Sequence, residues 1–366
     1  MIIALDATPL TVPTGGIRRY TWELAVALAK EFRQDQYWLL SDRPMPDTDA
    51  LPPNLHWGTG PRTRLEHRWW LWGLEREMSR RGVETFHGTD FAVPYLKRRP
   101  SVMTLHDLSP WRHEDWTHAE WMNDTWQTDA ARVRRRAPLL LRFGIATMVI
   151  TPSEAVRRNA INQFHLDPDR VRTVPLAAGP TFHPVRSRQR ERQYFLFVGT
   201  LEQRKNVNRL VEAWRHVRQQ FEVDLVLAGR IRDGFRPPSP EGGLHVLGAV
   251  PEADLPGWYT GALACVYPSL YEGFGLPVLE AMQCGALVIA SRDSAVMEVT
   301  AGSAIHVDAE DTAALADAMS VVARGQETFA ALRARALARS RDFTWQRTAR
   351  STREVYEDAR RVFGRN

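Results

Sequence analysis

Short apolar runs alternate with segments of helical periodicity over almost the whole chain. A continuous apolar run is typical of a strand that is buried on both faces, and helices between such strands indicate a parallel sheet. The pattern therefore predicts an α/β protein with two doubly wound domains. The strands of the first domain are expected at residues 2–5, 37–40, 83–86, 101–105, 146–150 and 171–174, and those of the second at 194–198, 223–227, 244–247, 263–267, 286–290 and 304–307.

The chain length and one turn-rich segment both indicate a division into two domains. At 366 residues the chain exceeds the size at which a single hydrophobic core usually stops growing. Residues 177–193 are rich in turn formers and charge and lack periodicity. We therefore predict an N-terminal domain at 1–180, a linker at 181–193 and a second domain at 194–343. Helical patterns are expected at 18–32, 65–81 and 153–164, and a last helical segment at 344–366.

Composition narrows the class of protein. Apolar residues make up 44% of the chain and charged residues 25%, which is ordinary for a globular protein. The net charge of +5 comes from dispersed arginines without a base-reading motif, so nucleic acid is not the expected partner. Cys265 and Cys284 have no disulfide or metal spacing and are expected as buried free thiols in a reducing compartment. No secretory signal is apparent, and residues 137–150 are too short to span a bilayer. We expect a cytoplasmic protein, with contact to the inner membrane face left open.

The most informative motif follows the predicted strand at 263–267. A glycine-rich loop leads into a helix expected to begin near Leu276, and Glu272 and Glu280 lie eight residues apart. Gly273 and Gly275 permit close approach of backbone N–H groups to a ligand, and a helix N-terminus favours phosphate. Carboxylates accept hydrogen bonds from hydroxyl groups. The motif therefore predicts a ligand that carries both phosphate and hydroxyls.

Polar residues also follow other predicted strands, at the sheet edge where ligands of open α/β sheets bind. They are Gly15 and Gly16 after the first strand, His106 and Asp107 after 101–105, and Thr200, Arg204 and Lys205 after 194–198. An adjacent arginine and lysine suit a diphosphate, because both neutralise phosphate oxygens. Each feature taken alone also has an ordinary structural explanation: a strand–helix turn, a structural histidine or a surface charge pair.

A metal site and a tryptophan function are the weaker hypotheses. The Asp-x-Asp triplets at 47–49 and 167–169 fall in turn-like contexts, and no P-loop motif is present. Ten of the 13 tryptophans fall within the first 126 residues, among them Trp69, Trp70 and Trp72. They indicate core packing for the most part, with an acceptor pocket or a membrane-facing surface as the alternatives.

Together these features resemble the family 4 glycosyltransferases, which are retaining enzymes of the GT-B fold, and the resemblance covers nearly the whole chain. Its most specific part is Glu272 to Glu280, which matches the family's E-x7-E motif. The segments at 104–107, 151–154 and 197–206 and the Gly15 and Gly16 loop are also similar. Gln203 departs from the pattern, since similar sequences often have proline there.

The resemblance implies a nucleotide-diphospho-sugar donor bound mainly by the second domain, with no metal and no cofactor. Arg204 and Lys205 would hold the diphosphate, Glu280 the ribose hydroxyls and Glu272 the transferred sugar, with His106 near the attacked face. The last helix would cross back to the N-terminal domain. Further donor contacts are implied for Gly15, Gly16, Thr200, Arg230, Val250, Gly273, Phe274, Gly275 and Leu276.

The resemblance favours a bacterial mannosyltransferase-like enzyme of polysaccharide assembly that uses GDP-mannose or a similar GDP-sugar. A UDP-sugar donor stays open, and the acceptor is a glycan, a lipid-linked or a small-molecule hydroxyl. Alternatives of other classes are a two-domain sugar-binding protein without catalysis, a nucleic-acid binder driven by arginine and a nucleotide-sugar epimerase. Turnover of a nucleotide sugar distinguishes a transferase from a sugar-binding protein without catalysis. Analysis of the products formed without an acceptor distinguishes a transferase from an epimerase.

Overall fold

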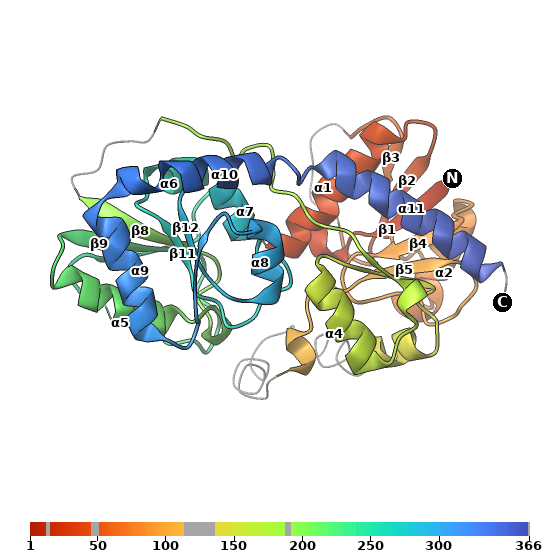
Figure 1. Cartoon of the computed structure of the whole chain (residues 1–366). Helices are drawn as coiled ribbons and strands as arrows, with labels where there is room; N and C mark the ends of the chain where they lie inside the picture. Colours follow the sequence, from red (N-terminus) through yellow and green to blue (C-terminus); the bar gives the residue numbers. More distant parts are fainter. Residues whose placement is uncertain (12–14, 45–50, 113–135, 187–191, 240, 365–366) are drawn as a thin grey trace. The chain divides into compact units, whose positions relative to one another are not determined.

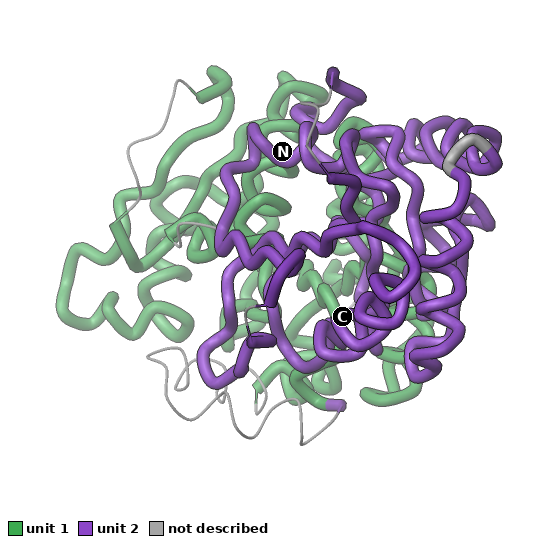
Figure 2. Tube along the Cα trace, turned by 90° about the vertical axis from the view of Figure 1, so that its left-hand side faces the viewer, with its two compact units in different colours: residues 1–111, 128–176, 344–366 green, residues 112–127, 177–343 purple. Residues whose placement is uncertain are grey.

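The structure is a computed structural model that describes residues 1–11, 15–44, 51–112, 136–186, 192–239 and 241–364. These residues divide into two compact units, each built on its own parallel sheet (Figure 2). Unit 1 takes the described residues of 1–111, 128–176 and 344–366, and unit 2 takes those of 112–127 and 177–343. The predicted α/β class with two doubly wound domains is confirmed.

Unit 1 contains a seven-stranded sheet in the order β3-β2-β1-β4-β5-β6-β7, and all of its pairings are parallel. The strands on one side of β1, at 85–88, 101–104 and 148–151, are buried at every residue, as expected for a sheet covered on both faces. The strands are β1 (Ile2–Asp6), β2 (Gln36–Leu40), β3 (Leu55–Trp57), β4 (Thr85–Gly88), β5 (Ser101–Thr104), β6 (Met148–Thr151) and β7 (Val171–Thr173). The pattern analysis missed β3, whose three residues have a histidine in the middle and are only partly buried, so that they form no apolar run.

The helices of unit 1 are α1 (Gly16–Glu31), α2 (Leu74–Arg80), α4 (Glu154–Phe164) and α11 (Trp345–Phe363). The C-terminal helix α11 packs against α1 and against β4, β5 and β6 (Figure 1). Its apolar stripe repeats every three or four residues, and that stripe is the face that it buries. Its buried members are Trp345, Thr348, Ala349, Thr352, Val355, Tyr356 and Ala359.

The continuous helix expected at 65–81 is wrong in its first part. A turn precedes a π-helical segment at Trp69–Gly73, and the α-helix begins only at Leu74. The N–H groups of Leu71, Trp72 and Gly73 all donate to the carbonyl oxygen of Arg68, which widens the helical register. A Cβ on Gly73 would lie 2.0 Å from the carbonyl oxygen of Glu66, so the backbone passes itself more closely than a regular helix would.

Unit 2 contains a six-stranded parallel sheet in the order β10-β9-β8-β11-β12-β13. Its strands are β8 (Gln193–Val198), β9 (Val223–Ala228), β10 (Leu244–Gly248), β11 (Cys265–Tyr267), β12 (Val288–Ser291) and β13 (Ile305–Val307). Cys265 and Cys284 are free and buried, as predicted. All six strands overlap the ranges predicted from the apolar runs.

The helices of unit 2 lie on both faces of its sheet. Helices α5 and α9 pack together, and α7 packs with α6, α8 and α10 (Figure 1). The sheet grows in opposite directions from β8 and from β11, so right-handed crossovers place α5 and α7 on opposite faces. The helices are α5 (Val207–Arg218), α6 (Leu255–Gly261), α7 (Leu276–Gln283), α8 (Ser294–Thr300), α9 (Thr312–Arg324) and α10 (Ala330–Ser340).

The tryptophans and the helices of the described residues bear on the alternative of a membrane-facing surface. No tryptophan among the described residues is exposed, which supports the packing interpretation, while Trp116, Trp121 and Trp126 lie outside those residues. None of the described helices has the length and apolar character needed to cross a membrane.

Candidate active site

The candidate donor-side residues meet where the strand order of unit 2 reverses. The loop after β8 and the loop after β11 leave neighbouring strands that lead to opposite sides of the sheet. Such a switch point is where open α/β sheets bind ligands. The first loop carries Arg204 and Lys205, and the second carries Glu272 and the glycines before α7.

Helix α7 begins directly after the glycine loop. Its N-cap is Gly275, whose φ of 97° lies in the left-handed region that glycine tolerates best. No side chain caps this end of the helix. Pro277 has no N–H, and Val278 and Leu279 already donate to the carbonyl oxygen of Gly275, so the N–H of Leu276 is the group that this first turn leaves for an anionic ligand. Phe274 is buried and packs edge-on against Phe343, which anchors the loop.

The glycine loop and the cationic loop are joined by a buried ion pair. The Nζ atom of Lys205 lies 2.5 Å from Oε1 of Glu272 and donates to the hydroxyl of Tyr267 at 2.7 Å. Burial lowers the pKa of Lys205, and the neighbouring carboxylate of Glu272 opposes this. An ammonium has three N–H donors, and two have partners among the described residues. The third is left for a ligand oxygen.

Arg204 is held by the same two loops. Its guanidinium donates to Glu202 at 2.9 Å and to the carbonyl oxygen of Tyr271 at 3.0 Å, and it lies 3.6 Å from Oε2 of Glu272. Glu202 also accepts from Arg232 at 2.5 Å. Burial by itself would raise the pKa of Glu202, but the surrounding cations lower it. Glu202 therefore orients Arg204, and its negative charge is neutralised by Arg204 and Arg232.

Pattern analysis missed Asp293, which supports the glycine loop from β12 and α8. Its Oδ2 accepts from the backbone N–H of Glu272 at 3.3 Å, and its Oδ1 caps α8 by accepting from Ala295 and Val296. Burial, together with the charge of Glu272, raises the pKa of Asp293 to about 6. An available signal was the Asp-Ser pair that follows a predicted strand and precedes a helical pattern, which is typical of an N-cap.

Glu280 lies inside α7 and is 3% exposed. Its Oε2 accepts a hydrogen bond from the hydroxyl of Tyr259 at 2.9 Å. The tyrosine therefore fixes the orientation of the second carboxylate of the motif, a contact that pattern analysis missed.

The remaining donor-side candidates of unit 2 lie at strand ends. Thr200 follows β8, while Arg230 and Val250 follow β9 and β10. Arg230 is exposed, and Thr200 and Val250 are half-buried. The turns after β8 and β9 touch, because Gly229 has no side chain: a Cβ there would lie 1.8 Å from the carbonyl oxygen of Gly199.

The unit 1 candidates lie at the carboxyl ends of β1 and β5. Gly15 and Gly16 are exposed at the start of α1, and Gly15 adopts φ 139°. Thr14 lies outside the described residues. His106 is half-buried, its Nε2 pairs with the carbonyl oxygen of Thr89 at 2.7 Å, and its ring packs edge-on against Tyr20. Burial lowers the pKa of His106, which favours the neutral imidazole.

Two carboxyl groups that pattern analysis missed lie near His106 in unit 1. Burial raises the pKa of Asp6 to about 6. The pKa of Asp90 is raised to about 7 by burial and by the charges of Asp6 and Asp107, and its Oδ1 is buried without a hydrogen-bond partner. Asp6 directly follows the predicted strand at 2–5, and Asp90 lies in the loop after the predicted strand at 83–86, so their positions after strands were a signal for this site.

Within the described part of the chain, no group of three or more His, Cys, Asp or Glu side chains is arranged to hold a metal ion. The triplet at 47–49 lies outside that part. Asp167 accepts from the backbone N–H of Asp169 and caps the short helix Pro168–Arg170, so it has a structural role.

Comparisons with known proteins identify the family of the chain and its fold. The family described as Glycosyltransferase Family 4 matches residues 14–180, and the family described as Glycosyl transferases group 1 matches residues 192–324. O-antigen chain mannosyltransferase B of Escherichia coli is 29% identical over 295 residues, which are 74% of this chain and 74% of that protein. Alpha-maltose-1-phosphate synthase of Mycolicibacterium smegmatis is 30% identical over 302 residues, covering 70% of this chain and 72% of that protein. The structure of sucrose-phosphate synthase from Thermosynechococcus elongatus has a TM-score of 0.74 at 20% identity and covers 100% of both chains.

Two parallel α/β units, with a glycine loop and paired cations at one switch point, define an enzyme of the GT-B glycosyltransferase class. The chain belongs to glycosyltransferase family 4, and the resemblance stated from its motifs is confirmed.

Proposed function

We propose that the protein transfers a mannosyl or similar hexosyl residue from a GDP-sugar to a hydroxyl of a growing glycan, with retention of anomeric configuration and without a metal. The observation that carries this proposal is the meeting of Arg204, Lys205 and Glu272 beside the uncapped N-terminus of α7. Two cations, together with the backbone N–H groups of the glycine loop and of Leu276, suit a diphosphate, while the carboxylate suits sugar hydroxyls.

The proposed chemistry places these groups where charge develops. The bond between the anomeric carbon and the diphosphate oxygen breaks, and its electron pair goes to the diphosphate. The acceptor oxygen bonds to the same carbon from the same face, and its proton passes to a diphosphate oxygen. Arg204 and Lys205 stabilise the negative charge on the leaving group, together with the N–H groups of Phe274, Gly275 and Leu276.

Retention by this front-face route is supported by the state of Glu272. Its carboxylate is engaged by Lys205 and Arg204, which suits hydroxyl recognition better than attack on carbon. We propose that Glu272 binds the transferred sugar and that Glu280 accepts from the ribose. In unit 1 we propose that His106 binds the sugar as a neutral imidazole.

Further donor contacts are proposed at the remaining candidates of both units. Those at the strand ends of unit 2, Thr200, Arg230 and Val250, are assigned to the nucleotide. Gly273 lies in the loop that would approach the diphosphate, and Gly15 and Gly16 would offer backbone N–H groups from the start of α1.

The preference for a GDP-sugar draws on the family resemblance, and the mannose on the name of the mannosyltransferase relative. Thermal-shift measurements with GDP, UDP and dTDP test it. A nucleotide at about a hundred times its dissociation constant adds roughly 2.7 kcal/mol of stability. We expect the largest shift with GDP and none of that size in Lys205→Ala. A larger thermal shift with UDP would mean that the donor is a UDP-sugar. The absence of a thermal shift with all three nucleotides would contradict the proposed function.

The stereochemistry is tested on the product. The enzyme is incubated with the donor found by thermal shift and a mannoside acceptor, and the new anomeric signal is read by NMR. The α-linked product expected from an α-linked donor supports retention, whereas a β-linked product contradicts the front-face route. Conversion of donor without acceptor into an isomeric nucleotide sugar would indicate epimerisation instead.

A further inference from the structure

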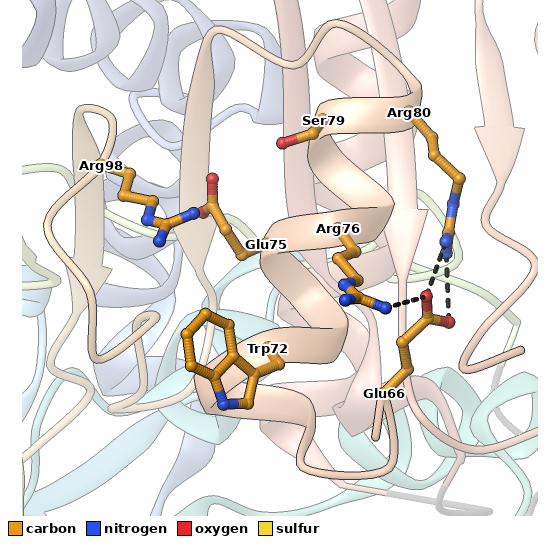
Figure 3. Close-up of a pocket in the computed structure, with 7 residues that line it drawn as sticks. All are labelled: Glu66, Trp72, Glu75, Arg76, Ser79, Arg80 and Arg98. Atoms are coloured by element: carbon orange, nitrogen blue, oxygen red, sulfur yellow. Dashed lines mark hydrogen bonds and ion pairs between the residues drawn. The ribbon is translucent and has the colours of Figure 1, made fainter. Parts of the chain in front are cut away.

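A cavity lies in unit 1, among residues that do not belong to the candidate active site. It has a volume of about 490 Å³ and is built mainly on α2 and the π-helical segment before it (Figure 3). Arg98, from the loop between β4 and β5, faces α2 across this cavity. Its lining residues are Glu66, Trp72, Glu75, Arg76, Ser79, Arg80 and Arg98.

On one wall of the cavity, the negative charge of Glu66 is already balanced by arginines. Glu66 accepts from the backbone N–H of Arg62 at 2.7 Å and from Arg80 at 2.8 Å, and Arg76 lies 3.8 Å away. The hydrogen bond from Arg80, followed by that from the Arg62 backbone, lowers the pKa of Glu66 to about 2. Arg80 also pairs with Glu77 at 2.6 Å. Glu66 and Arg80 therefore form a closed charge cluster that shapes the wall.

Glu75, in contrast, has an unused acceptor. It is 5% exposed, and its Oε1 accepts from Arg99 at 2.6 Å. Its Oε2 is buried and has no hydrogen-bond partner in the described structure. A buried acceptor without a donor is unfavourable, so a ligand hydroxyl that donates to it would be stabilised.

The other side chains bring positive charge and an aromatic face. Arg76 is half exposed and touches Glu66 only at long range, so its guanidinium is not fully used. The guanidinium carbon of Arg98 lies 5.8 Å from the ring centroid of Trp72. Figure 3 shows Trp72, Glu75 and Arg98 around the same opening. An indole face packs well against the C–H face of a sugar ring, and a guanidinium fork fits a phosphate.

We propose that this cavity is a second carbohydrate site that binds a sugar phosphate or polyol phosphate. The phosphate lies against Arg76 and Arg98, the ring lies on Trp72, and a ring hydroxyl donates to Oε2 of Glu75. A neutral sugar leaves the guanidinium groups without an anion. Inorganic phosphate has no ring to lie on Trp72, and its negative charge is repelled when it approaches the carboxylate of Glu75. The site is separate from the proposed transfer chemistry and does not depend on it.

Isothermal titration of the full chain with glucose 6-phosphate tests the site, with glucose and inorganic phosphate as comparison ligands. We expect glucose 6-phosphate to bind about tenfold or more tightly than either. The double variant R76A/R98A should weaken this binding by about tenfold or more, and R76K/R98K should give an intermediate loss because the charge stays and the fork is lost. The variant E75Q should narrow the preference for glucose 6-phosphate over inorganic phosphate.

A matched control removes two exposed arginines of unit 2 in R324A/R335A, which changes the net charge equally and should leave binding unchanged. The Lys205→Ala variant should also bind glucose 6-phosphate as the parent does. Binding that is lost in Lys205→Ala and kept in R76A/R98A would place the ligand in the candidate active site and overturn the proposal. Equal affinity for glucose and glucose 6-phosphate would overturn it as well.

A second experiment distinguishes a lipid headgroup from a free or glycan-borne sugar phosphate as the ligand. Flotation with phosphatidylcholine vesicles, with and without phosphatidylinositol, is compared for the parent and R76A/R98A. Recruitment by phosphatidylinositol that glucose 6-phosphate reverses assigns the site to a lipid headgroup. Absence of recruitment, together with glucose 6-phosphate binding, assigns it to a free or glycan-borne sugar phosphate. Absence of both overturns the proposal.

Discussion

The Nζ atom of Lys205 lies 2.5 Å from Oε1 of Glu272, although the two residues are 67 positions apart in the chain. They leave the ends of β8 and β11, which are neighbours in the sheet but lie on either side of the reversal in strand order. The pair therefore ties together the two loops that flank the switch point. Its burial means that removal of either partner leaves a charge in a poorly solvated position.

Substitution of Lys205 or Arg204 by alanine should lower turnover about a hundredfold or more. The reason is that one preorganised charge opposite a leaving diphosphate typically lowers the barrier by about 3 kcal/mol. Steady-state kinetics with the preferred nucleotide sugar measure this, with Arg335→Ala of α10 as the exposed arginine control. If both variants kept the parental turnover, neither residue would belong to the mechanism.

Alanine at Asp293 should lower turnover about tenfold and also destabilise the fold, because it releases the Glu272 backbone and uncaps α8. Asp311 offers a matched control, since it caps α9 through the N–H of Ala314 and does not contact the glycine loop. Each variant should lose about 1 kcal/mol of unfolding free energy as a lost cap. Steady-state kinetics and urea unfolding of the two variants distinguish a role of Asp293 in the site from its role as a helix cap. An equal loss of turnover in Asp311→Ala would mean that the effect comes from general destabilisation.

Much of the fold follows from local pattern, whereas the contacts of the site do not. Apolar runs predicted twelve of the thirteen strands in the described part of the chain, because a strand that is buried on both faces forms a continuous apolar run. The edge strand β3 is only partly buried and contains a histidine, so it forms no such run. The positions of Arg204, Lys205, Glu272 and Glu280 after strands were predicted for the same reason. Their partners Tyr267, Tyr259 and Asp293 were not predicted. These residues are distant in the sequence, and the order of the strands in the sheet, which brings them close, cannot be derived from a short stretch of sequence.

The π-helical segment illustrates a second limit. The spacing of apolar residues at 65–81 fits an α-helix, and nothing in that spacing reports that one carbonyl, that of Arg68, accepts three successive N–H groups. The close passage of Gly73 beside Glu66 is set by the tertiary fold of unit 1. The cavity beside Trp72 and Glu75, which this π-helical segment helps to form, could therefore not be predicted from the sequence.

Alanine at Gly229 should destabilise unit 2 strongly, whereas alanine at Gly257 should not. A Cβ on Gly229 would lie 1.8 Å from the Gly199 carbonyl oxygen, and the φ of 152° is also unfavourable for alanine, so we expect a loss of about 3 kcal/mol. Gly257 lies in α6, and a Cβ there meets nothing within 4 Å. Alanine at this position should add roughly 0.5 kcal/mol by helix propensity.

Denaturant unfolding of the two glycine variants gives both values. Comparable stability of Gly229→Ala and the parent would mean that the turns after β8 and β9 do not approach each other so closely. That result would also weaken the assignment of Thr200 and Arg230 to one nucleotide site, because this approach brings their turns together.

His87 should make the stability of unit 1 sensitive to mild acid. It is fully buried between Tyr356 of α11 and Thr104 of β5, with hydrogen bonds of 2.8 Å to each hydroxyl. Burial, with a smaller contribution from His106, lowers the pKa of His87 to about 3. In the unfolded chain the pKa returns to about 6.5. Between these values the unfolded chain binds a proton that the folded chain does not, so stability falls as the pH falls below about 6.5.

Urea unfolding of the parent and of His87→Asn across this range isolates the effect. The asparagine cannot take up the proton, while the other titrating groups, Asp6, Asp35 and Asp90 among them, remain in both proteins. The stability advantage of the parent should shrink by about 1.4 kcal/mol for each pH unit below about 6, which is the linkage slope of one proton. An advantage that stays constant from neutral pH to about pH 5 would mean that His87 is protonated in the folded state. The helix α11 would then be docked by a charged imidazole, and the neutral pairing with Tyr356 and Thr104 would have to be abandoned.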